Sequence, residues 1–70
     1  MSTNGTALRK LRMEARMSQN ELSRDAGVSR DTISLAENDK TNLQELSRNK
    51  IAGALGDKLG RTVDPDLLGD

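Results

Sequence analysis

The sequence predicts an all-α domain, a compact bundle of four or five short helices. Apolar residues recur at spacings of three and four along most of the chain, which is the period of an amphipathic helix. Residues that favour helix N-caps precede several of these runs, and a glycine ends one of them. The 70 residues include no aromatic side chain, so the core has to be built from aliphatic residues and methionine.

The first helix is expected over about residues 7–16, after a polar, flexible arm at residues 1–5. Leu8, Leu11 and Ala15 are spaced three and four residues apart and should face inward. The main folded domain is expected over residues 6–56, and a tail over residues 57–70.

A second helix should begin at Gln19 and end before Gly27. Ser18 and Glu21 have the spacing of a capping box, in which each side chain accepts from a backbone amide at the helix start. Leu22 and Ala26 lie on one face, and Gly27 adopts a left-handed backbone at low cost.

A third helix is expected over residues 30–37, with Ser29 as its N-cap and Ile33 and Ala36 facing inward. Val28 should pack between the second and third helices. Two short helices joined by a tight turn form the element that many proteins insert into the major groove of DNA.

Beyond this pair, Asn38 or Asp39 is expected in a left-handed conformation. Asn42 and Glu45 form a capping pair that would open a fourth helix, which continues through Leu55 or as far as Leu59. The apolar residues expected to line this segment are Leu43, Leu46, Ile51, Ala54 and Leu55.

The tail is acidic but contains apolar residues, and Asp64 followed by Pro65 predicts a terminal helical turn at residues 65–68. Two interpretations are open for residues 59–68. The segment packs back on the core, or it contacts a second subunit or another protein.

Residues 7–56 resemble the helix-turn-helix of the phage repressor and Cro-type family, also called the Xre family, which has the lambda-repressor-like fold. The resemblance rests on an ordered set of residues. The family's opening pattern is present at residues 11–19, and its closing "IA-x-ALG" pattern runs from Ile51 to Gly56. The set comprises Gln19, Leu22, Gly27, Val28, Ile33 and Glu37. The chain departs from the family near Asp39, where glycine is usual, and at Arg48 and Asn49, where apolar residues are usual.

The resemblance implies a sequence-specific transcription regulator of double-stranded DNA, with repression as the expected mode. It implies a homodimer on a pseudo-palindromic operator, read in the major groove by residues 30–37. It also implies a DNA contact at Gln19 and a structural ion pair between Arg12 and Glu37.

The chemistry of the individual side chains indicates how they would contact DNA. Arg30 can bind guanine O6 and N7 or a phosphate, and Leu35 can meet a thymine methyl group or belong to the core. Asp31 can accept from cytosine or stabilise the helix N-terminus. The full set of candidate DNA-binding residues is Gln19, Ser29, Arg30, Asp31, Thr32, Ser34, Leu35, Asn38 and Lys40.

The charge balance limits electrostatic adhesion to DNA, because eleven basic and eleven acidic residues give a net charge of zero. Residues 1–56 hold nine basic and seven acidic residues, so the expected reading domain is slightly positive. Phosphate contact depends on the local face, where Arg9, Lys10, Arg30 and Lys40 are available.

Composition also excludes several classes of function. Cysteine and histidine are absent, which removes disulfides, thiol nucleophiles and histidine-based zinc or acid-base chemistry. We therefore expect no enzymatic activity, no cofactor and no metal. No leader or long apolar run is present, which predicts a cytoplasmic protein without a membrane segment. The alternative function is a protein-interaction module, such as an antitoxin-type regulator that binds a partner through residues 59–68.

Overall fold

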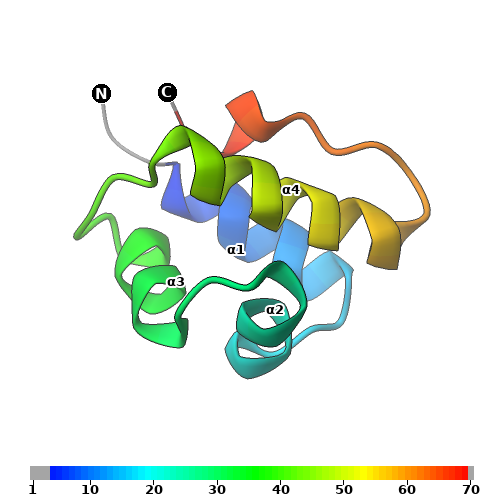
Figure 1. The fold of residues 1–70 in the computed structure, drawn as a ribbon, viewed down its shortest axis with the longest axis horizontal. Coiled ribbons are helices and arrows are strands. Elements are labelled where there is room, and N and C mark those ends of the chain that lie inside the picture. The colour runs from blue at the N-terminus through cyan, green and yellow to red at the C-terminus, as the bar shows by residue number, and fades with distance from the viewer. Residues whose placement is uncertain (1–3, 70) are drawn as a thin grey trace.

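The computed structural model describes residues 4–69 and shows an all-α bundle, as the sequence predicts (Figure 1). α2 packs against α3 and α4, while α1 contacts α3, α4 and the terminal 3-10 turn η1. The elements in chain order are α1 (Gly5–Glu14), α2 (Gln19–Ala26), α3 (Arg30–Glu37), α4 (Glu45–Leu59) and η1 (Pro65–Leu68).

The core is aliphatic and receives side chains from every element. Close packing of branched and unbranched aliphatic residues replaces the aromatic residues that most small cores contain. The side chains with no exposed surface are Leu8, Leu22, Ile33, Ile51, Leu55 and Leu68. Leu11, Val28, Ala54 and Leu59 pack around them while half-buried.

α1 begins and ends two residues earlier than the predicted range 7–16. The Asn4 side chain accepts a hydrogen bond from the Ala7 amide and caps the helix, so Gly5 is already helical. At the other end, Arg16 takes a left-handed backbone with φ of 57°, and the Met17 amide donates to the Arg12 carbonyl over 3.1 Å. This pattern closes the last turn and stops the helix. The predicted arm falls largely on residues 1–3, which lie outside the described residues.

Asp39 rather than Asn38 takes the left-handed position after α3, with φ of 58°. Its Oδ1 accepts a hydrogen bond from the Gly5 amide over 3.1 Å, which satisfies a free donor at the start of α1. A glycine at this position would relieve the backbone but lose this bond. The departure from the family pattern therefore has a structural reason, since Asp39 links the end of α3 to the beginning of α1.

α4 begins at Glu45, but the predicted capping pair of Asn42 and Glu45 is wrong. The N-cap is Gln44, whose side chain makes no capping bond. Leu43 is buried before the helix starts, and its carbonyl accepts from Arg48 Nη1 over 2.6 Å. Among the apolar residues expected along this segment, Leu46 lies outside the core, with its side chain 64% exposed.

The C-terminal tail packs back on the core. Pro65 opens the predicted terminal turn, and the Asp64 side chain accepts from the Asp66 amide over 2.9 Å. Leu68 is fully buried, and its carbonyl accepts from the Asn4 amide over 3.0 Å. Leu67 points outward and is 53% exposed. The first interpretation of the tail is thus confirmed, and dimerisation stays a prediction.

The expected ion pair between Arg12 and Glu37 is present and joins α1 to the end of α3. Arg12 Nε lies 2.6 Å from Glu37 Oε2, and Arg12 Nη2 lies 3.0 Å from Glu37 Oε1, which makes the pair bidentate. The exposed fractions of the two side chains are only 14% and 3%. The hydrogen bond to Glu37 raises the pKa of Arg12 above its usual value, although burial of the guanidinium opposes this shift.

Gly5→Ala should destabilise the domain. An added Cβ would lie 2.5 Å from the Glu37 carbonyl oxygen and 2.6 Å from that of Ala36, and both are backbone atoms. Crowding of this kind should lower the free energy of unfolding by about 1–3 kcal/mol. Urea unfolding measures the change. The matched control is Gly53→Ala within α4, because a Cβ at this position meets nothing within 4 Å. This substitution should stabilise the helix by about 0.5–1 kcal/mol. Equal effects of the two substitutions would contradict the close approach at Gly5.

Arg12→Met should lower the free energy of unfolding by about 3–5 kcal/mol, because it leaves the buried Glu37 carboxylate without its cation. Adding Glu37→Leu removes the stranded charge and should restore much of the loss. The measurement is a double-mutant cycle by chemical denaturation. Additive losses in the double variant would show that the two side chains stabilise the domain independently.

Candidate nucleic-acid interface

The predicted unit of two helices and a turn is confirmed from Gln19 to Glu37. The capping box of α2 forms in both directions, with Glu21 N to Ser18 Oγ at 3.0 Å and Ser18 N to Glu21 Oε1 at 3.3 Å. Gly27 ends α2 with φ of 70°, and Ser29 caps α3. The inward side chains Leu22, Ala26, Ile33 and Ala36 are buried, as predicted. These contacts fix the turn between the helices and leave the opposite side of α3 uncovered.

The uncovered side of α3 presents a mixture of charged and apolar groups. Arg30 and Asp31 are exposed in the first turn of the helix, and Lys40 is exposed in the loop after it. Leu35 is 46% exposed, so it is not part of the core. A guanidinium, a carboxylate and an aliphatic side chain on one short helix match the donors, acceptors and methyl groups of the major groove.

Four other candidate residues take part in local hydrogen bonds that shape α3. Ser29 Oγ accepts from the Thr32 amide over 3.1 Å and lies 2.7 Å from the Thr32 hydroxyl. Asn38 Nδ2 donates to the Ser34 carbonyl over 2.9 Å at the C-terminal end. Ser29 and Asn38 thus stabilise the two ends of the helix, and any contact with DNA would use the remaining capacity of these groups.

Gln19 is half-buried at the start of α2 and touches the ion pair. Its Nε2 donates to Glu37 Oε1 over 3.1 Å, so one carboxylate holds side chains from α1 and α2. An amide NH₂ group has two hydrogens, and the second, together with the amide oxygen, is left for another partner. No local sequence pattern predicts this bond, because the two residues lie 18 positions apart.

Within the part of the chain that the structure describes, no helix is both long enough and apolar enough to cross a membrane.

Comparisons with known proteins agree with this geometry. The family model described as helix-turn-helix matches residues 8–59. The restriction-modification controller protein C.AhdI from Aeromonas hydrophila has a similar solved structure, with 28% sequence identity and a TM-score of 0.78. The match covers 93% of this chain and 89% of that one. No curated protein matches the chain at a significant level.

The family match spans most of the chain and contains the whole unit from Gln19 to Glu37, while the fold agrees with that of a controller protein over nearly its full length. The chain therefore belongs to the helix-turn-helix family of DNA-binding transcription regulators, of the Xre and Cro type.

Proposed function

We propose that the protein is a sequence-specific regulator that inserts α3 into the major groove of double-stranded DNA. The observation that carries this proposal is the uncovered face of α3, with Arg30, Asp31 and Leu35 exposed on a helix whose other side is fixed by the core. Rigid placement favours specific contact, because side chains on a fixed helix lose little freedom on binding. The likeness to a restriction-modification controller protein supports a regulatory role.

The proposed contacts divide into those that read bases and those that position the protein. Arg30 would bind guanine or a phosphate, and Leu35 would meet a thymine methyl group. Gln19 would donate its second amide hydrogen to a phosphate at the start of α2. Asp31 would accept from a cytosine amino group and would repel DNA that lacks one, which adds specificity and limits affinity.

We further propose that two subunits bind a pseudo-palindromic operator with half-sites about one helical turn, or roughly 10 base pairs, apart. Occupation of such an operator over a promoter would repress transcription. Support for a dimer comes from Leu67 on η1, which is 53% exposed although its neighbour Leu68 is fully buried. A subunit contact that covers Leu67 would remove this aliphatic surface from water.

The alternative of an antitoxin-type module that binds a protein through residues 59–68 has less support. Val63 and Leu68 belong to the core, and Leu59 packs against it, so most apolar side chains of the segment are occupied within the chain.

Arg30→Ala should weaken binding to the specific operator by about 1–3 kcal/mol and relax base preference, whereas Gln19→Ala should weaken binding to all duplexes alike. The measurement is fluorescence anisotropy at low salt with duplexes from the DNA around the gene. Lys58→Ala is the control, because Lys58 is exposed on α4. If the wild-type protein shows no preference among these duplexes, or if both variants bind like wild type, the proposal is wrong.

Leu67→Lys should shift the protein from dimer to monomer, because a buried charge at a subunit contact lacks a partner. Sedimentation equilibrium measures the change, and circular dichroism checks that the fold is intact. Met13→Lys is the matched control, since Met13 is 63% exposed on α1, remote in sequence from the tail. A wild-type monomer at all concentrations, alone and on DNA, would refute the dimer.

A further inference from the structure

We propose that one edge of α1, formed by Arg9, Arg12 and Arg16, is a second DNA contact surface that binds backbone phosphates beside the segment read by α3. This inference rests on the proposed function. It assigns to Arg9 and Arg16 a role in affinity, separate from base recognition by α3.

The position of this arginine edge is set by the Arg12 guanidinium. Besides its two bonds to Glu37, Arg12 donates from Nη1 to the Met17 carbonyl over 3.0 Å. The guanidinium therefore lies where α1 ends, α2 begins and α3 ends. Gln19 reaches the same carboxylate. The edge thus adjoins the proposed phosphate contact of Gln19, and Glu37 neutralises the charge of Arg12 itself.

Arg9 lies on the same edge, one turn before Arg12. At 3.6 residues per turn, the two side chains are separated by about 60° around the helix axis, whereas Lys10 is separated from Arg12 by about 160°. Arg9 is exposed, and no carboxylate among residues 4–69 pairs with it. Arg9 and Lys10, adjacent in sequence, thus serve different faces.

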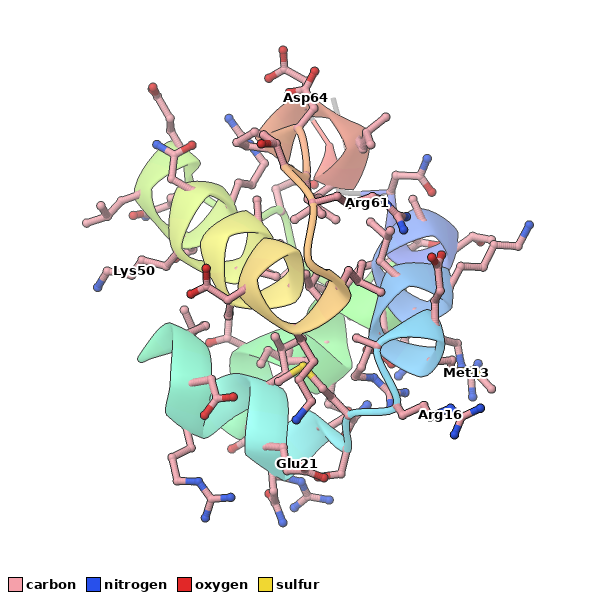
Figure 2. The ribbon with its side chains drawn as sticks, turned by 90° about the vertical axis from the view of Figure 1, so that its right-hand side faces the viewer. Met13, Arg16, Glu21, Lys50, Arg61 and Asp64 are labelled. Carbon is pink, nitrogen blue, oxygen red and sulfur yellow. The ribbon has the colours of Figure 1, made fainter. Side chains whose placement is uncertain are left out.

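Arg16 extends the edge beyond the end of α1. Figure 2 shows its side chain reaching outward beside that of Met13 and away from Glu21. The two nearest acidic residues in the sequence are occupied, because Glu14 pairs with Arg61 over 2.7 Å and Glu21 forms the capping box of α2. Arg16 also occupies a left-handed conformation, with φ of 57°, that glycine would adopt at lower cost. A contribution to DNA binding would be a reason for arginine at this position despite the cost in stability.

Phosphate is the ligand that this surface fits best. The guanidinium fork matches the geometry of a phosphate, and two unpaired guanidinium groups flank a third that is already fixed. The whole chain has no net charge, and Asp31 on α3 repels phosphates. Attraction to DNA therefore has to come from a local set of unpaired cations, and the arginine edge supplies one next to the reading unit.

The test is the salt dependence of binding to duplex DNA. In the wild-type protein, the logarithm of the binding constant should fall linearly with the logarithm of the salt concentration. Arg9→Gln combined with Arg16→Gln should make the slope less steep by about 0.9 for each lost phosphate contact, with base preference unchanged. The control is Lys50→Gln combined with Lys58→Gln, which removes the same charge from two exposed positions on α4. In Figure 2, Lys50 lies on the opposite side of the molecule from Arg16.

A slope that is the same in the arginine variant and the wild type would overturn the inference, as would an equal change in the lysine control. A wild-type protein that binds no duplex would overturn the proposed function itself, which is a different result. Arg16→Gly gives a second readout. It should raise the thermal unfolding midpoint by relieving the backbone while it lowers the salt slope, a combination that a purely structural role for Arg16 would not produce.

Discussion

The carboxylate of Glu37 is the group on which the arrangement of the first three helices depends. Its two oxygens accept from Arg12 on α1 and from Gln19 on α2, and the residue itself ends α3. Because this side chain is only 3% exposed, these bonds form where water competes little. These bonds join the end of α3 to α1 and to the start of α2, and they add a polar contact to the aliphatic packing that holds the three helices together.

The ends of the helices matter as much as their faces. α2 and α3 have only eight residues each, too few to be stable alone in water, so they depend on packing and on satisfied ends. Left-handed residues close the last turns, and two of them, Arg16 and Asp39, are not glycine. Asp39 compensates for its strained backbone by binding the amide of Gly5, where α1 comes closest to α3. The strained backbone after α3 is thus offset by a hydrogen bond to the first residue of α1.

The distribution of charge reconciles a neutral chain with a DNA-binding family. Several charged groups are neutralised within the protein, as in the pairs Arg12–Glu37 and Arg61–Glu14. The attraction of the protein to DNA therefore depends on the cations that stay unpaired more than on the net charge of the chain. In the proposed arrangement, Arg30 reads bases while the edge of α1 supplies attraction, so specificity and affinity come from different elements.

Much of the fold followed from short stretches of sequence. The capping box at Ser18, the left-handed Gly27 and the limits of α2 and α3 depend on residues within one or two turns, so a local pattern predicts them. Packing between distant segments decided the rest. Leu43 rather than Leu46 fills the core, and Gln19 binds Glu37, since both depend on how helices meet in space. The sequence by itself determined which helices form, the chemistry of α3 and the pair of Arg12 with Glu37, whereas only the tertiary structure decided the contacts between distant residues that follow no local pattern, such as Gln19 with Glu37 and Asp39 with Gly5.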